Sequence, residues 1–296
     1  SQLGAVSGIK GNDKYLPHLL GHEATGIIEK TAKNVKDLKK NDKVILHWQK
    51  NLLKDSKLPQ YFDSKSKKIN AGWLTTFNTK AVVSKNRVTK LPKKLSMKEG
   101  ILFGCSLTTS YGSIFKDSKI NLSRKNLILI TGGGMIGQSI ITLLNNQKQE
   151  IFVVEHNIKK IKFIKKNFPK IKFIKNIKKN KIFFDYIYET TGIKNIIEFS
   201  YNFIKNNGKL ILIGVPKFNE KININTLGIN YGKKIIGSYG GGVVPERDIK
   251  TIFAYIKKNR INLKKLIQGP YSLKNINLIM KKMMNGQIVN KPIIKF

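Results

Sequence analysis

The segment that most constrains this fold is a glycine-rich turn at residues 132–137, with the sequence Gly-Gly-Gly-Met-Ile-Gly. Four apolar residues, 127–130, precede it, and apolar residues at helical spacing follow it. This order predicts a strand, a tight turn and a helix. In such a unit Gly132 allows the sharp turn, Gly134 leaves room for a pyrophosphate at the backbone N–H groups, and Gly137 lets the helix pack on its strand.

The turn has a second feature beside it that supports nucleotide binding. Met135 and Ile136 open the expected helix, whose N-terminus carries a partial positive charge that favours phosphate. The next apolar run, 151–154, ends in Glu155, where a carboxylate can accept hydrogen bonds from both hydroxyls of an adenosine ribose. The alternative is an ordinary strand-to-helix turn with an unrelated surface glutamate.

Apolar runs alternate with helical patterns through the second half of the chain. We expect strands at 127–130, 151–154, 171–174, 186–189, 209–213 and 234–238, with helices between them that include 194–205. This alternation predicts an α/β fold with a doubly wound parallel sheet. Beyond it we expect a helix at 245–258, a second helix after Ser272 that ends near Gly286, and a last strand at 292–296.

The first part of the chain, to about residue 122, has a mostly β pattern. Short apolar runs at 26–28, 44–46 and 81–83 predict strands, and Gly, Asn and Asp turns separate them. The polar, Lys-rich stretch 50–70 shows no period and is expected to be an exposed loop.

The net charge of +39 raises the question of a polyanionic partner. Only four of the 56 basic residues are arginines, although arginine is the residue that reads bases and phosphates bidentately. The lysines are spread over every expected helix and loop, together with many Ile and Asn residues, a pattern typical of an A/T-rich coding bias. We therefore expect no specific nucleic-acid partner, and a polyanion-binding surface stays as an alternative.

The cysteine content and the lengths of the apolar runs bear on the compartment. Cys105 is the single cysteine, so no internal disulfide can form, and this suits a reducing cytoplasm. No apolar run approaches the roughly 18 residues that a membrane-spanning helix needs. The sequence favours a cytoplasmic protein without a membrane segment.

Five motifs together resemble the zinc-containing medium-chain alcohol dehydrogenases, which combine a GroES-like catalytic domain with a Rossmann domain. They are residues 17–23, which contain Gly21-His22-Glu23, residues 42–44, residues 104–109, the glycine turn and residues 208–214. The resemblance covers essentially the whole chain. It implies a zinc-dependent oxidoreductase that transfers a hydride between an alcohol or aldehyde and NAD, and that forms a homodimer.

The resemblance implies a catalytic zinc with His22 and Cys105 as ligands and Glu23 close behind the metal. Imidazole and thiolate are ligands that a catalytic Zn²⁺ prefers, with one position left open. The family's first cysteine ligand would lie two residues before Ser1, so we expect the chain to be truncated at its N-terminus and a cysteine to precede it. Ser1 then matches the hydroxyl that relays the alcohol proton, and the family's further relay histidine would fall at Gly4, so that relay is absent or rerouted.

Several further positions take roles from the resemblance. Trp48 matches an aromatic residue of the substrate pocket, which gives Ser1, His22, Glu23 and Trp48 as the catalytic set. Many members also hold a structural zinc with four cysteines, but the matching region 49–71 contains no cysteine and excludes that ligand set. The expected cofactor residues are Thr109, Gly132, Gly134, Met135, Ile136, Gly137, Glu155, Thr190, Gly214, Val215 and Lys291.

The resulting hypothesis divides the chain into residues 1–108 of the catalytic domain, residues 109–238 of the Rossmann domain, and residues 239–296, which return to the catalytic domain. The active site is expected in the cleft between them. One alternative is a zinc-free quinone or enoyl reductase of the same superfamily, which has no need for His22 and Cys105. A second is a basic polyanion-binding protein on an inherited dehydrogenase fold, and a third is that the chain without its first ligand is inactive.

Overall fold

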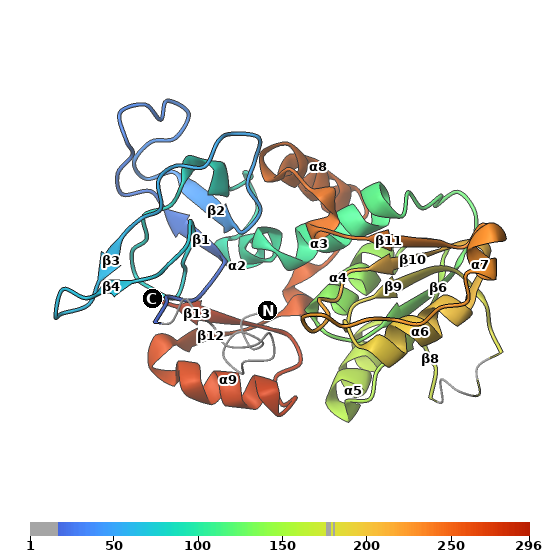
Figure 1. Ribbon diagram of the computed structural model, residues 1–296. Coiled ribbons are helices and arrows are strands. Elements are labelled where there is room, and N and C mark those ends of the chain that lie inside the picture. The colour runs from blue at the N-terminus through green and yellow to red at the C-terminus, as the bar shows by residue number, and fades with distance from the viewer. Residues whose placement is uncertain (1–16, 176–178, 180) are drawn as a thin grey trace.

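The computed structural model describes residues 17–175, 179 and 181–296. Figure 1 shows a β-rich part, blue to cyan, beside an α/β part that runs from green to orange. Helix α3 (Ser106–Gly112) lies between the two parts and follows directly on the β-rich part in the chain (Figure 1). Both parts therefore border the segment that carries Cys105.

The larger sheet has six parallel strands in the order β11-β10-β9-β6-β7-β8. The chain enters this sheet at the central strand β6 and continues through β7 to the edge strand β8. It then returns to the centre at β9 and continues through β10 to β11 on the other side. This is the predicted doubly wound arrangement. The strands are β6 (Leu127–Thr131), β7 (Glu150–Val154), β8 (Lys172–Phe173), β9 (Phe184–Glu189), β10 (Ile204–Leu212) and β11 (Lys234–Gly237).

Helices cover both faces of this sheet, because successive side chains of a strand point to opposite faces. Ile128 and Ile130 pack in one cluster with residues of α4, α5 and α8, whereas Leu129 packs in another with residues of α6. The strands are apolar throughout for this reason. The helices are α4 (Met135–Leu144), α5 (Ile158–Asn167), α6 (Lys194–Asn202), α7 (Leu227–Asn230) and α8 (Pro245–Lys258).

The β-rich part is built on a three-stranded antiparallel sheet, β1-β2-β5. Val44 of β2 packs in a small local cluster, and its neighbour Ile45 joins the large cluster of the α/β part. The two parts therefore share one continuous core. The elements here are β1 (Glu23–Ile27), β2 (Lys43–His47), β3 (Tyr61–Phe62), β4 (Lys68–Ile69), β5 (Val88–Lys90) and α2 (Met97–Gly100).

The last thirty residues return toward the β-rich part, as Figure 1 shows. They form β12 (Ile267–Ser272), α9 (Ile276–Met284) and β13 (Lys291–Lys295), and the two strands pair in parallel. The Ser272 hydroxyl accepts a hydrogen bond from the Lys274 N–H at 3.3 Å and caps the short turn Leu273–Asn275 that leads into α9. Short helical turns complete the chain: Lys85–Arg87, Ile101–Gly104, Ser113–Asp117, Gly240–Gly242, Leu263–Leu266 and Leu273–Asn275.

The prediction of a strand at 81–83 is wrong. These residues form no strand, and the third strand of the sheet is β5, a few residues later. The Val82 N–H donates to the Tyr61 hydroxyl at 2.9 Å instead of to a neighbouring strand. The Val82 side chain is 68% exposed, so this apolar run lies on the surface.

The helix predicted at 194–205 ends earlier, at Asn202. Strand β10 begins at Ile204, which pairs with Phe184, and the register then shifts before Lys209. Asn207 has a φ of 63°, a conformation that Asn adopts more readily than most residues. The Asn207-Gly208 pair is therefore an irregularity inside the strand and not the stop of the helix.

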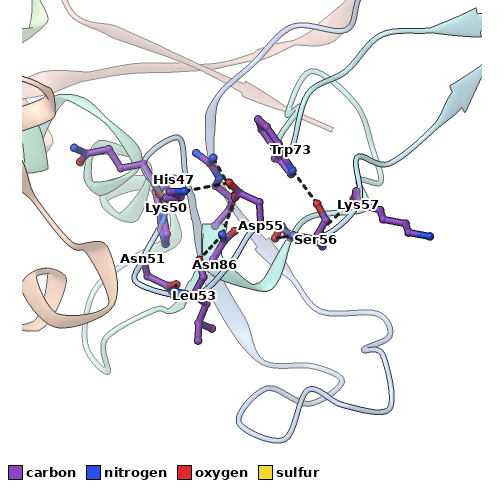
Figure 2. Close-up of polar contacts among 12 residues, drawn as sticks. His47, Lys50, Asn51, Leu53, Asp55, Ser56, Lys57, Trp73 and Asn86 are labelled. Carbon is purple, nitrogen blue, oxygen red and sulfur yellow. Dashed lines mark hydrogen bonds and ion pairs between the residues drawn. The ribbon is translucent and has the colours of Figure 1, made fainter.

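The exposed loop predicted at 50–70 holds the short hairpin of β3 and β4. Its polar side chains also form a network, drawn in Figure 2. Asp55 accepts from Asn86 Nδ2 at 2.7 Å and from Lys50 Nζ at 3.4 Å, and Trp73 Nε1 donates to the Ser56 carbonyl at 3.0 Å (Figure 2). Carboxylate, amide and indole groups therefore hold this lobe together in a region without cysteine.

Candidate active site

The side chains of His22, Glu23 and Cys105 converge. Each offers one ligand atom, and these atoms all lie within 4.8 Å of one another. Glu23 opens β1, and Cys105 lies between the Ile101–Gly104 turn and α3. A Cβ on Gly104 would lie 2.6 Å from Glu23 Cβ, so a glycine before Cys105 lets the two segments meet.

Burial sets the protonation of this cluster. It lowers the pKa of His22, so the imidazole is neutral and able to ligate a metal near pH 7. Burial, assisted by the charge of Glu23, raises the pKa of the Cys105 thiol to about 12. A bound cation would reverse that second effect, because thiols deprotonate when they coordinate metals.

Glu23 has one satisfied and one unsatisfied carboxylate oxygen. Its Oε1 accepts a close contact from Lys291 Nζ and lies 3.6 Å from His22 Nε2. Its Oε2 is buried and meets no hydrogen-bond donor among the residues that the structure describes. A buried carboxylate oxygen without a donor, beside an imidazole and a thiol, is a donor set that fits a divalent cation such as Zn²⁺.

The cluster opens into a cavity of about 2650 Å³. Most of the residues predicted for the site line this cavity, together with apolar side chains from both parts of the chain. The predicted residues that line it are His22, Glu23, Trp48, Cys105, Thr109, Met135, Ile136, Thr190, Gly214, Val215 and Lys291. The expected position of Ser1 lies outside the described residues.

The glycine turn has the backbone geometry that the sequence pattern predicts. Gly132 has a φ of +96°, and a Cβ there would lie 2.7 Å from Thr190 Oγ1. Gly137 approaches the turn so closely that a Cβ would lie 2.0 Å from the Gly132 carbonyl oxygen. Gly134 lies at the N-terminus of α4, and no heavy atom would lie within 4 Å of a Cβ placed on it. This leaves the space that a phosphate would need.

Glu155 lies at the end of β7 and turns back toward the glycine turn. Its Oε2 accepts from the Gly133 N–H at 2.8 Å, and its Oε1 accepts from the Asn157 N–H at 2.8 Å. Lys160 Nζ is 3.6 Å from Oε2, and the carboxylate side chain is only 3% exposed. Burial by itself would raise the pKa of Glu155, but the backbone N–H donors and Lys160 outweigh it and lower the pKa.

Lys291 contacts the cluster of His22, Glu23 and Cys105. It comes from β13, and its Nζ pairs with Glu23 at the His22 cluster. Its expected role in binding the cofactor stays a prediction. Because Lys291 and Glu23 are 268 residues apart, the sequence carries no signal for this pair.

Two residues near the site were not assigned a role from the sequence. Glu189, at the end of β9, is fully buried and accepts from the Thr191 N–H at 2.6 Å and from the Gly192 N–H at 3.1 Å. Tyr239 lies in the turn after β11 and contacts Trp48. Glu189 could have been found from the sequence, because it ends an apolar strand just before Gly192. Tyr239 could not, because its role depends on a contact across 191 residues of sequence.

Comparison with known proteins identifies the N-terminal part of the chain. Residues 4–93 match the alcohol dehydrogenase GroES-like domain. Alcohol dehydrogenase 6 of Peromyscus maniculatus is 24% identical, and the match covers 93% of this chain and 82% of that protein. S-(hydroxymethyl)glutathione dehydrogenase of Komagataella pastoris is 25% identical, with 92% and 82% covered.

Solved structures share the fold over the whole chain. Benzyl alcohol dehydrogenase from Acinetobacter calcoaceticus has a TM-score of 0.85 at 20% identity, with 100% of this chain and 88% of that chain covered. Acetophenone reductase from Geotrichum candidum, in complex with NAD, has a TM-score of 0.80 at 15% identity, with 100% and 85% covered. With the glycine turn and the six-stranded sheet, these findings show that the chain is similar over nearly its whole length to alcohol dehydrogenases, and that residues 4–93 match their GroES-like domain.

Proposed function

We propose that this protein is a zinc-type, NAD-dependent alcohol dehydrogenase that interconverts a small alcohol and its aldehyde. The observation that carries the proposal is the meeting of His22, Glu23 and Cys105 at a cavity that Met135 and Ile136 of the nucleotide-type turn also line. A ligand set that could hold a metal and a dinucleotide turn at one cavity suit hydride transfer between an alcohol and a nicotinamide.

In this proposal His22 Nε2 or Nδ1 and Cys105 Sγ would hold the zinc, which as a Lewis acid lowers the pKa of a bound alcohol. Glu23 supplies the negative charge behind the cluster, and Lys291 compensates that charge when no metal is bound. Thr109, Thr190, Gly214 and Val215 line the same cavity and would orient the nicotinamide half.

The preference for NAD rests on Glu155. A carboxylate at the end of β7 accepts hydrogen bonds from ribose hydroxyls and repels a 2′-phosphate, which supports a preference of roughly a hundredfold. Lys160, 3.6 Å from this carboxylate, is the opposing charge. The related folds occur with either cofactor, since CAD from Helicobacter pylori was solved with NADP(H) and acetophenone reductase from Geotrichum candidum with NAD.

The proposal includes a division of the chain at residues 108 and 238, with the substrate cleft between the parts, and a homodimer as the assembled state. Among the residues that the structure describes, no helix is both long and apolar enough to cross a membrane. The partners in this proposal are therefore a small alcohol or aldehyde and NAD, in the cytoplasm, and neither a specific nucleic acid nor a membrane.

Metal analysis and turnover test the function together. The chain is purified with zinc present, its metal content is measured by mass spectrometry, and oxidation of a series of primary alcohols is followed by NADH absorbance. We expect bound zinc and NADH formation, and loss of both in Cys105→Ser and His22→Ala. The control is Tyr231→Ala, because that side chain is 57% exposed and does not line the cavity.

Other outcomes favour the alternatives. If the purified chain contains no metal and reduces quinones or enones with a nicotinamide, it is a zinc-free reductase and the zinc mechanism is wrong. A chain that turns over nothing but binds DNA with a steep dependence on salt would identify a polyanion-binding protein. The net charge of +39 is the observation behind this second alternative.

A further inference from the structure

Gln138 is a buried amide in helix α4, directly after the last glycine of the turn at 132–137. Its side chain is 0% exposed, and apolar side chains fill the buried positions 140, 141, 143 and 144 of the same helix. Its Oε1 meets no hydrogen-bond donor among the residues that the structure describes. A buried polar atom without a partner costs free energy, so an amide at this position indicates a role that an apolar side chain could not fill.

The amide nitrogen of Gln138 donates to two carbonyl oxygens from different parts of the chain. One belongs to Gly133 in the glycine turn, at 2.8 Å, and the other belongs to Val289, at 2.7 Å. Val289 lies between α9 and β13, in the segment that returns toward the β-rich part. Both N–H groups of the amide are therefore used, and a hydroxyl, which has one O–H, could satisfy only one of the two carbonyl groups.

Side chains hold both polar backbone groups of Gly133. Its N–H donates to Glu155 Oε2 at 2.8 Å, and its carbonyl oxygen accepts from Gln138. The next residue, Gly134, is the N-cap of α4, where backbone N–H groups would face a pyrophosphate. The two side chains therefore set the shape of the turn before a dinucleotide binds, which lowers the entropic cost of binding.

The second contact of Gln138 leads to the candidate metal cluster. Val289 lies two residues before Lys291, the first residue of β13. The Lys291 ammonium pairs with Glu23, a member of that cluster. One buried amide thus connects the turn expected to bind the dinucleotide with the strand that carries Lys291.

A further amide joins the same two regions by a longer contact. Asn157 Nδ2 donates to the Gly286 carbonyl at 3.4 Å, near the limit of a hydrogen bond. The contact from Gln138 to Val289 is 2.7 Å long and comes from a fully buried side chain. Gln138 is therefore the stronger of the two links.

Resting on the proposed function, we infer that Gln138 is a positioning residue for the dinucleotide. It holds the glycine turn in its binding shape and ties that shape to the position of β13. A dinucleotide that binds the turn therefore also stabilises the arrangement in which Lys291 lies beside Glu23. Gln138 acts through the backbone of Gly133 and Val289.

Binding of two cofactor fragments separates positioning from a purely structural role. ADP-ribose contains the pyrophosphate, whereas adenosine carries the ribose of the same half without any phosphate. In Gln138→Leu we expect the Kd for ADP-ribose, measured by calorimetry, to rise about tenfold, the effect of losing one buried hydrogen-bond donor. The Kd for adenosine, measured by ligand-observed NMR, should change by less than about twofold, because adenosine does not reach the turn.

Ser139→Ala is the matched control. Ser139 is the next residue of α4, it is equally buried, and its hydroxyl has no hydrogen-bond partner in the described part of the chain. This substitution should leave both Kd values unchanged. If Gln138→Leu loses the native circular dichroism spectrum, Gln138→Met, whose unbranched side chain also lacks the donors, provides the measurement.

Two results would overturn the positioning role. One is an unchanged Kd for ADP-ribose in a folded Gln138 variant, and the other is an equal rise for ADP-ribose and adenosine. Either result, with alcohol oxidation by the unaltered chain, would leave the proposed function intact. If the unaltered chain binds no ADP-ribose, the proposed function and this inference are both wrong.

The link between Gln138 and Lys291 is measured by a double-mutant cycle with Lys291→Met. The effects of Gln138→Leu and Lys291→Met on the Kd for ADP-ribose should not simply multiply, because each change releases the same strand. Effects that multiply as for independent sites would show that the turn and β13 are uncoupled, and would overturn this part of the inference.

Discussion

At the scale of single residues, the chemistry of Cys105 depends on whether a metal is bound. In the metal-free chain, burial raises its pKa from 9.0 to about 12. At pH 8 the thiolate fraction is then about a thousandfold below that of the unfolded chain. Folding disfavours this ionisation, so the thiol also makes stability fall as the pH rises above 9.

The prediction is that iodoacetamide alkylates the folded, metal-free chain about a thousandfold more slowly than the chain in urea, measured by mass spectrometry at pH 8. Since Cys105 is the single cysteine, the rate reports on one site. Equal rates in the two states would show that the thiol is accessible and ionised in the fold.

Glu155 is expected to affect both the stability of the fold and the choice between NAD and NADP, and two substitutions can separate these effects. Its carboxylate accepts the backbone N–H groups of Gly133, His156 and Asn157, so Glu155→Ala should lower the free energy of unfolding by about 1–3 kcal/mol. The same change should raise kcat/KM with NADP relative to NAD by about tenfold or more. Glu155→Gln, which removes the charge and keeps an acceptor oxygen, should show the change in cofactor ratio with a smaller loss of stability.

Urea unfolding and kinetics with both cofactors measure these two quantities. A Glu155→Gln protein with the unaltered cofactor ratio would mean that the carboxylate serves the glycine turn alone and that Lys160 and its neighbours determine cofactor choice.

At the scale of elements, α3 packs very closely on the turn Gly240–Gly242 that follows β11. A Cβ on Gly112 would lie 2.0 Å from the Gly241 carbonyl oxygen. Gly112→Ala should therefore separate α3 from the turn that carries Tyr239 and lower the free energy of unfolding by about 1–3 kcal/mol.

Gly26→Ala is the control for this prediction, because nothing lies within 4 Å of a Cβ at Gly26 and its φ is not positive. It should change stability by no more than about 0.5 kcal/mol. Equal effects of the two substitutions in urea unfolding would contradict the packing argument.

At the scale of the whole molecule, the net charge of +39 sets a dependence on salt. The 17 acidic residues pair with some lysines, as Lys205 does with Asp185 at 3.0 Å, but most of the positive charge stays uncompensated. We expect the Tm to rise by several degrees between about 0.1 M and about 1 M sodium chloride, because the Debye length falls from about 10 Å to about 3 Å and screens the repulsion.

Differential scanning calorimetry measures this shift, and glucose at equal osmolality is the control for effects that do not depend on charge. A Tm that falls with added sodium chloride would show that attractive ion pairs outweigh the mutual repulsion of the lysines.

The sequence by itself determined the features that depend on local pattern. The strand at 127–130, the glycine turn and the helix after it follow from apolar periodicity and from the backbone freedom of Gly132. Both are local properties, which depend only on residues close together in the chain. The parallel sheet follows from the alternation of such units. The motif around His22 and Cys105 was recognised because the residue types and their order are specific in combination.

The tertiary structure alone decided which distant residues meet. Lys291 pairs with Glu23, and the ring of Tyr239 meets that of Trp48 edge to face, through contacts between elements that are far apart in the chain. The run at 81–83 has the apolar pattern of a strand, but a strand must pair with a neighbouring strand. Here the Val82 N–H donates to the Tyr61 hydroxyl instead. Pairing partners and long-range contacts depend on how whole elements pack, and no local property of those residues encodes that.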